Sequence, residues 1–422
     1  MKICVQGLWH LGTVTAACLA SAGHEVVGLD FNAETIGRLN QGTPPIFEPG
    51  LEALVREGLK GGKLSFTTDI SLAVDGVQLL WITYDTPVGD DDKADVPFVL
   101  ERVKQTLPHL RGRPVVLVSS QLPVGSTRSL ETSDATFACS PENLRLGKAI
   151  ASFTHADRVI VGIRDERDRK LLEELFSSFT SHIEFMSVES AEMTKHALNA
   201  FLATSVSFIN EVASICEQVG ADAKEVERGL KSEPRIGPKA YLSPGAAFAG
   251  GTLARDISFL TEIGRTKDVP TDLLAGVRAS NTKHRGWARR KLTQALDDLN
   301  GKTIAVWGLT YKPGTDTLRR SGAIELCEWL HQNGARVHAH DPAVKTLPAP
   351  LATYIQLFDE PLAALQNAAA LVVATEWPEF GMIVGARIIS AMDSAVIVDA
   401  NRFLSKALES QKAVQYFSVG KS

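Results

Sequence analysis

Two glycines and a carboxylate near the N-terminus form the first candidate ligand-binding pattern. Gly7 and Gly12 bracket a short loop between an apolar run at 2–6 and a helical stretch at 12–22, and Asp30 ends the next apolar run. Glycine permits the turn, a helix N-terminus binds a diphosphate, and a carboxylate at this place accepts from a ribose hydroxyl. A 2′-phosphate would be repelled by Asp30, so the pattern favours NAD over NADP.

The centre of this loop departs from the usual pattern. Trp9 stands where a GxGxxG loop has its middle glycine, which normally lets the backbone approach the diphosphate. An indole is tolerated there only if it points away or if the cofactor shifts. From this segment alone, two interpretations stay open: a cofactor loop that includes His10 and Leu11, or a Rossmann-type core that has lost cofactor binding.

A lysine and an asparagine form a second pair. Lys195 and Asn199 lie four residues apart in a stretch of helical period, so they share a helix face. An ammonium and an amide aimed at one oxygen stabilise developing negative charge. On periodicity alone, a solvated lysine and a surface asparagine explain the pair better.

A polar loop follows the apolar run at 303–308. It carries Lys312, Thr315, Asp316 and Arg319. Ligands of α/β proteins bind at the carboxyl ends of strands, so we interpret the loop as ligand-binding and keep a solvated surface loop as the alternative.

The strands and helices predicted around these residues form an α/β pattern in both halves of the chain. A helical stretch without glycine or proline separates them at 189–219, and helical sequence continues to about residue 290. We predict two doubly wound Rossmann-like domains joined by a long central helix and a helical middle region, with boundaries at 1–190, 191–298 and 299–422. The remaining predicted strands are 25–30, 77–84, 114–119, 158–163, 182–186, 336–340, 370–375 and 395–399, and a helix at 322–333 ends at a Gly334 cap.

Composition excludes several classes of protein. The chain has 422 residues, a net charge of −5, 44% hydrophobic and 22% charged residues, which predicts a folded protein and gives no footprint for nucleic acid. Its five cysteines form no CxxC pair, and His338 and His340 have no third ligand, so we expect no metal site and a reducing cytoplasm. No leader peptide and no transmembrane segment are predicted.

Motifs spread over the whole chain resemble the UDP-glucose/GDP-mannose dehydrogenase family. They are Asn40–Leu51, Thr86–Pro87, Pro123–Thr127, Ser140–Gly147, Lys195–Phe201, Asn210–Glu211, Pro234–Gly237, Ser243–Gly245, Gly308–Asp316, Arg319, Ser321, Asp341–Pro342 and Thr375–Trp377. The resemblance implies a cytoplasmic enzyme of sugar or polysaccharide biosynthesis. Such an enzyme oxidises C6 of a nucleotide sugar twice and uses two NAD⁺, and a UDP-hexose is the expected substrate. It also implies a homodimer built on the central helix.

The resemblance assigns roles to residues of this chain. The expected catalytic residues are Glu142, Lys195, Asn199, Thr252 and Asp256. The expected cofactor-binding residues are Gly7, Trp9, His10, Leu11, Gly12, Asp30, Thr86, Gln121, Arg255 and Arg319. The expected substrate-binding residues are Leu144, Arg145, Arg235, Tyr241, Ser243, Gly245, Lys312 and Arg402.

One departure from the family bears on the chemistry. The family's GFGGSCxxKD segment aligns with residues 247–256, and Thr252 takes the place of its nucleophilic cysteine. A hydroxyl needs an adjacent base where a thiol is partly ionised, so we expect the second oxidation to be impaired or to stop at the aldehyde. Cys139, beside the Ser140–Gly147 motif, is the only cysteine that we expect could substitute for it in space. Two alternatives remain: a redox-neutral epimerase with bound NAD and a non-catalytic nucleotide-sugar binder.

The family pattern changes at other positions as well. Gln121 stands where the family usually has threonine, and Asp85 precedes Thr86 where glycine is usual. Asn143 and Leu146 alter the family's NPEFLREG segment.

Overall fold

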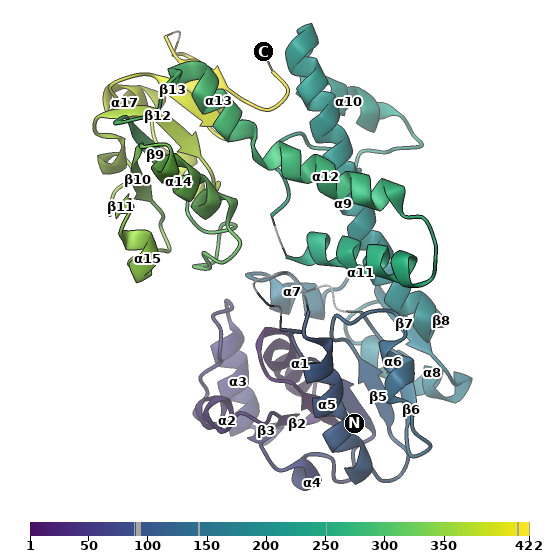
Figure 1. The fold of residues 1–422 in the computed structure, drawn as a ribbon. Coiled ribbons are helices and arrows are strands. Elements are labelled where there is room, and N and C mark those ends of the chain that lie inside the picture. The colour runs from purple at the N-terminus through teal and green to yellow at the C-terminus, as the bar shows by residue number, and fades with distance from the viewer. Residues whose placement is uncertain (88, 90–93, 142–143, 250, 412, 422) are drawn as a thin grey trace. The chain divides into compact units, whose positions relative to one another are not determined.

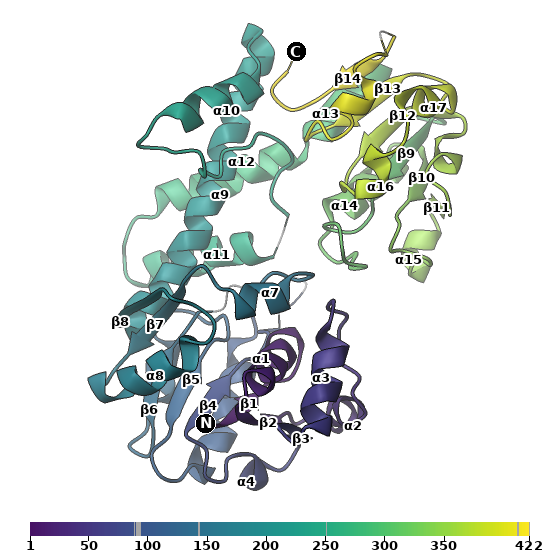
Figure 2. The same cartoon turned by 180° about the vertical axis from the view of Figure 1, so that it is seen from behind.

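The computed structural model divides the chain into two compact units, Met1–Ala197 and Leu198–Ser422. It describes residues 1–87, 89, 94–141, 144–249, 251–411 and 413–421. Each unit contains one sheet with helices on both faces (Figures 1 and 2). The predicted fold class, two Rossmann-like domains with a long central helix, is confirmed. The three predicted boundaries are not decided by this division and stay a prediction.

The first unit is built on a sheet of eight strands in the order β3-β2-β1-β4-β5-β6-β7-β8. The strands are β1 Lys2–Gln6, β2 Glu25–Leu29, β3 Leu64–Thr67, β4 Leu79–Ile82, β5 Val115–Val118, β6 Thr136–Cys139, β7 Val159–Ile163 and β8 Ile183–Ser187. The helices are α1 His10–Ser21, α2 Ala33–Asn40, α3 Leu51–Lys60, α4 Ile70–Ala73, α5 Val96–Thr106, α6 Ser126–Leu130, α7 Ala149–Thr154 and α8 Arg169–Phe176, with short 3₁₀ turns at Leu107–His109 and Glu166–Asp168.

Alternation along the strands supplies two separate cores. Ile3 and Val5 of β1 pack into the core under α1 and α3, whereas Cys4 packs into the core on the opposite face. Strands buried on both faces read as continuous apolar runs, which is why these segments were predictable.

One strand pair contradicts the expected parallel sheet, because β6 and β7 are antiparallel. Helix α7, with 6 residues, rises only about 9 Å along its axis. That length is too short to carry the chain back across the sheet, so β7 starts at the edge where β6 ends.

The central helix α9, Val188–Val219, lies where it was predicted and belongs to both units. Within the described ranges it is the one helix long and apolar enough to cross a membrane by length and composition. Long core helices of soluble proteins meet the same criterion, and α9 contributes Ala203, Ile209 and Ala213 to the buried interior.

The second unit continues with four helices and a sheet of six parallel strands, ordered β11-β10-β9-β12-β13-β14. This is the order of the first six strands of the other sheet. The helices are α10 Ala223–Ser232, α11 Thr252–Thr266, α12 Asp272–Arg285, α13 Trp287–Leu296, α14 Gly322–Gln332, α15 Ala349–Ala352, α16 Pro378–Gly381, α17 Gly385–Ser390 and α18 Ser405–Leu408, with a 3₁₀ turn at Ala363–Leu365. The strands are β9 Thr303–Trp307, β10 Arg336–His340, β11 Ile355–Leu357, β12 Ala368–Val373, β13 Val396–Asp399 and β14 Gln415–Phe417.

Candidate functional site

Close packing against the end of β4 fixes the loop between β1 and α1. Gly7 has φ +97°, and a Cβ on it would lie 2.7 Å from the Tyr84 ring. A Cβ on Gly12 would lie 1.8 Å from the Gly7 carbonyl oxygen. Neither position accepts a side chain, so the loop keeps the bare backbone that a diphosphate site needs.

The indole of Trp9 lies at the surface. Trp9 precedes the first residue of α1, its side chain makes no capping hydrogen bond, and 51% of the residue is exposed. The bulky residue therefore does not fill the turn formed by the two glycines.

Carboxylates already hold the backbone N–H groups of this loop. Asp30 accepts from the N–H of Leu8 at 2.8 Å and from the N–H of Asn32 at 2.9 Å. Asp85, from the segment after β4, accepts from the N–H of Leu11 at 3.0 Å. Asp30 thus braces the loop in addition to its predicted role toward ribose.

The imidazole of His10 is directed at a buried carboxylate. His10 Nε2 lies 3.0 Å from Glu48, which is only 4% exposed. Glu48 also accepts from the N–H groups of Gly147 and Ala149, each at 2.8 Å. His10 therefore links the phosphate-binding loop to the start of α7, a role that its position in the loop did not reveal.

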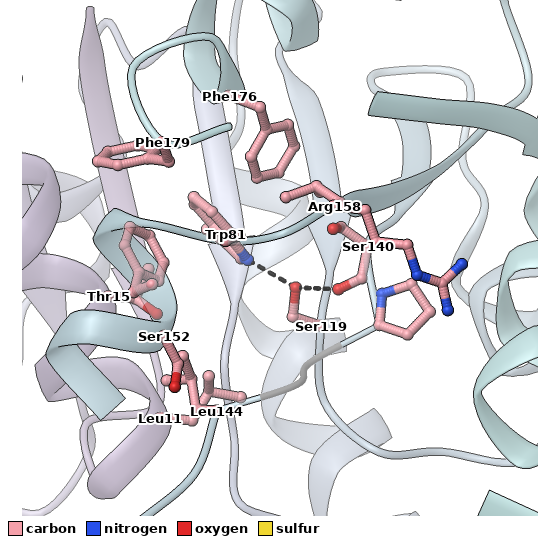
Figure 3. A pocket seen from close by; sticks show the side chains of 14 residues that line it. Leu11, Thr15, Trp81, Ser119, Ser140, Leu144, Ser152, Arg158, Phe176 and Phe179 are labelled. Atoms are coloured by element: carbon pink, nitrogen blue, oxygen red, sulfur yellow. Dashed lines mark hydrogen bonds between the residues drawn. The ribbon is translucent and has the colours of Figure 1, made fainter. Parts of the chain in front are cut away.

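A small apolar cavity of about 80 Å³ lies under these loops (Figure 3). Leu11 and Leu144 line it together with aromatic rings. Trp81 Nε1 donates to the Ser119 hydroxyl at 2.8 Å, and that hydroxyl donates in turn to the Ser140 carbonyl oxygen. Leu144 thus packs inward beside a cofactor-loop residue, whereas Arg145 is exposed.

Lys195 lies on α9 beside a second cavity, of about 20 Å³, that Gln121, Cys139 and Glu192 also line. Thr86 donates to the Gln121 carbonyl oxygen at 2.8 Å. Burial, and next the nearby Glu192 carboxylate, raise the pKa of the Cys139 thiol well above its ordinary value. A thiol held in its neutral form is a poor nucleophile, so the structure argues against Cys139 as a substitute. Glu142 lies outside the described residues.

Asn199 and Asp256 meet in the second unit. The Asn199 amide donates to the Asp256 carboxylate, which is fully buried. Thr252 is the first residue of α11, one turn before Asp256, and its side chain is exposed. Arg255 lies between them in the sequence and is partly buried. Three predicted catalytic residues are therefore joined through one helix and one hydrogen bond.

The predicted substrate loop around Gly245 is held by amide side chains. Asn210 of α9 accepts from the Gly245 N–H at 3.0 Å, and Asn401 accepts from the Ala246 N–H at 2.7 Å. His284 donates to the Gly245 carbonyl oxygen at 2.8 Å. A Cβ on Gly245 would lie 2.0 Å from Asn401, so only glycine fits.

The ends of this loop are more open. Tyr241 is 58% exposed. Ser243 accepts from Lys224 of α10 at 2.6 Å.

His284 makes the stability of this loop depend on pH. Burial lowers the pKa of His284 below its ordinary value of 6.5, although its hydrogen bond to Gly245 partly opposes the shift. The folded state therefore resists protonation of His284. The stability that the neutral imidazole contributes is complete above pH 6.5 and is lost as the pH falls below 6.5 toward the lowered pKa of the folded state. We expect His284→Gln, which keeps a donor, to lose less melting temperature than the wild type between about pH 7 and about pH 5.5. Equal losses would contradict this.

A cavity of about 350 Å³ opens at the carboxyl ends of β9 and β12. Lys312, Arg285 and Arg289 line it, as does Ser321, which caps the N-terminus of α14. Cations and a helix N-terminus are the groups that bind a diphosphate.

A carboxyl group and an amide also line this cavity. Burial raises the pKa of Glu376, which hydrogen-bonds Asn401. Glu376 lies in the Thr375–Trp377 motif that carries the family resemblance. Neither Glu376, Arg285 nor Asn401 was predicted as a site residue.

Three predicted ligand-binding arginines lie elsewhere. Arg402, with φ +62°, pairs with Asp222 at 2.7 Å and donates to the Val419 carbonyl oxygen. Arg235 is exposed and pairs with Glu233. Arg319 is exposed in the loop before α14. His338 and His340 are bound to the carbonyl oxygens of Ala364 and Phe358.

A dinucleotide-type loop in one Rossmann-like unit and a cationic cavity at the strand ends of another define a two-nucleotide dehydrogenase architecture. Three family models match in order: the NAD-binding domain of the UDP-glucose/GDP-mannose dehydrogenase family over residues 1–180, its central domain over 189–283 and its UDP-binding domain over 305–406. The chain belongs to this family. The first match indicates NAD as the cofactor, and the third supports binding of a UDP-sugar.

Individual relatives agree over their whole length. The chain is 32% identical to the UDP-glucose 6-dehydrogenase of Pseudomonas aeruginosa, covering 100% of this chain and 98% of that one. It is 34% identical to the UDP-glucose 6-dehydrogenase of Rhizobium meliloti, covering 100% of each. The structure of a UDP-glucose dehydrogenase from Pyrobaculum islandicum superposes with a TM-score of 0.88 at 30% identity, covering 100% of this chain and 98% of that one.

Proposed function

We propose that this chain oxidises the C6 hydroxyl of a UDP-hexose with NAD⁺ and releases the aldehyde, reaching the acid only slowly through the aldehyde hydrate. The observation that carries this proposal is the exposed Thr252 at the start of α11, one turn from the Asn199–Asp256 pair. Polar groups suited to the first oxidation are present there. The thiol that would capture an aldehyde is absent at this position, and the buried Cys139 does not supply one.

NAD⁺ supplies the hydride acceptor. In the first oxidation, a base takes the proton of the C6 hydroxyl, and a hydrogen bound to C6 leaves as hydride. Lys195 and Asn199 support the developing alkoxide charge. Asp256 holds the Asn199 amide and so fixes the direction of one of these donors. Without a thiol adduct at C6, the second hydride has no efficient donor.

UDP is the expected nucleotide. The match to a UDP-binding domain and the relatives' printed activity support it. Lys312 offers a cation to the diphosphate, as does Arg285, whose guanidinium also pairs with Glu325 of the same cavity. The loop held by Asn210 and His284 borders this cavity.

The test is the number of NADH molecules formed per UDP-glucose consumed at saturating NAD⁺, with products identified by mass spectrometry. One NADH and an aldehyde would support the proposal, and two NADH with UDP-glucuronate would contradict it. An isomeric product without NADH would indicate an epimerase. Binding without conversion would indicate a binder or another sugar.

We also propose that a second copy of the chain packs on α9. Phe201, Phe208 and Ile215 recur every seven residues on this helix and are 67%, 50% and 62% exposed. A stripe of large exposed apolar side chains at heptad spacing is typical of a helix–helix interface.

This surface predicts a change of mass on mutation. We expect Phe208→Lys to convert a dimer into a monomer in analytical ultracentrifugation, because a charge would be buried in an apolar interface. Met382→Lys is the matched control, since Met382 is 75% exposed and lies in the second sheet domain. A monomeric wild type, or a variant that stays dimeric, would reject the surface.

A further inference from the structure

The first turn of α1 is the place where a coenzyme diphosphate would bind, yet one of its donors is already engaged. The first N–H groups of a helix have no partner within the helix, and dinucleotide diphosphates use them. Here Leu11, the second residue of α1, donates to the Asp85 carboxylate at 3.0 Å. Helix α1 has no acidic residue in its own first turn, and Trp9 makes no side-chain cap. The anion at this helix end therefore comes from a distant segment.

The backbone on either side of Asp85 is anchored. Thr83, fully buried, donates to the carbonyl oxygens of Gln6 and Gly7, each at 3.0 Å. Thr86, 6% exposed, donates to the Gln121 carbonyl oxygen at 2.8 Å. These three hydrogen bonds tie the segment to the phosphate-binding loop and to the segment after β5. Asp85 itself is exposed, so a ligand from solvent can reach the carboxylate that accepts from the Leu11 N–H.

We infer that Asp85 is an affinity-determining residue for the coenzyme: its carboxylate is an internal anion that the diphosphate must displace from the Leu11 N–H. The Asp85 carboxylate and a diphosphate oxygen cannot both accept the single hydrogen of the Leu11 N–H, and two negative charges placed beside the same donor repel each other. The inference rests on the proposed use of NAD⁺. It adds that the Asp85 carboxylate weakens the binding of NAD⁺ to this loop. The same weakening is expected for ADP-ribose, which carries the same diphosphate.

The test compares the wild type with Asp85→Gly and Asp85→Asn. We expect NAD⁺ and ADP-ribose, measured by calorimetry, to bind about tenfold more tightly to Asp85→Gly. Asp85→Asn should show a smaller gain, because its amide oxygen can still accept from Leu11. Adenosine, which lacks phosphate, should bind all three proteins equally. Without ligand, Asp85→Gly should melt at a lower temperature than the wild type, because the helix loses its cap.

A matched control removes a carboxylate elsewhere. Asp165 accepts from the backbone N–H of Arg167 after β7, and Asp165→Asn should leave the affinity for NAD⁺ unchanged. If Asp85→Gly does not fold, Asp85→Asn and Asp85→Ser carry the test.

Unchanged or weaker NAD⁺ binding in the Asp85 variants would overturn the inference, as would the absence of binding in all of them. If the wild type binds too weakly to titrate and the variants bind, the inference holds. Formation of NADH from UDP-glucose by the wild type is measured separately. Tighter NAD⁺ binding by the variants, without NADH formation from the sugar, would keep this inference and reject the proposed function. NADH formation by the wild type, without tighter NAD⁺ binding by the variants, would keep the proposed function and reject this inference.

Discussion

Replacing Lys195 by methionine is expected to lower kcat for NADH formation from UDP-glucose by about 100- to 1000-fold. The methionine keeps the length and apolar stem of the side chain but removes the ammonium that would stabilise the alkoxide at C6. Because that charge develops in the transition state, kcat should fall far more than KM changes. Initial rates at saturating NAD⁺ provide both constants.

The control separates charge from folding. Lys170 is exposed on α8 of the same unit, and Lys170→Met makes the same change away from the cavity of Lys195. Its kcat should equal that of the wild type. If Lys195→Met retained full kcat with an unchanged melting temperature, Lys195 would not be a catalytic residue. In that case the solvated-lysine interpretation would stand.

The parts of the fold that could be predicted are those in which local pattern and tertiary packing agree. Strands β1, β9 and β10 and helix α9 are long, uninterrupted patterns and were predicted almost to the residue. Strands β3, β6, β11 and β14 were missed. They are three or four residues long and each contains a polar residue, whereas the equally short β4 and β5 are wholly apolar runs that stand out in the sequence. The direction of β7 follows from the length of α7, a short helix that the pattern did not show.

The candidate site residues show the same contrast between local patterns, which the sequence reveals, and contacts made by folding, which it does not. Gly7, Gly12 and Asp30 were visible because their spacing is local. The partners that decide how the loop works were not, since Asp85 lies 74 residues from Leu11 and Glu48 lies 38 residues from His10. Asn401 meets Ala246 from 155 residues away. Such pairs leave no period in a single sequence, because only the fold brings them together. Glu48 stood in a motif that carries the family resemblance, and Asp85 was noted as a departure from the family pattern, but neither observation showed which atom the residue would contact.

Replacing Thr252 by cysteine is expected to change the product from the aldehyde to an enzyme-bound acyl group and then the acid. The thiolate adds to the C6 carbonyl, the adduct gives its hydride to a second NAD⁺, and water cleaves the resulting thioester. Thr252 is exposed and is the first residue of the 15-residue helix α11, which has no acidic residue in its first turn. A helix N-terminus lowers the pKa of a thiol, so the position favours the reactive form.

The measured ratio of NADH to sugar should rise from about one toward two in Thr252→Cys. Hydrolysis should be slow, because Gln121 and Leu146 depart from the family pattern, so the acyl group should be visible as added mass on the intact protein. Thr252→Ser keeps a hydroxyl and should behave like the wild type. If Thr252→Cys bound UDP-glucose yet still released only aldehyde, the missing thiol would not be what stops the second oxidation. The altered segments around Gln121 and Leu146 would then be the block.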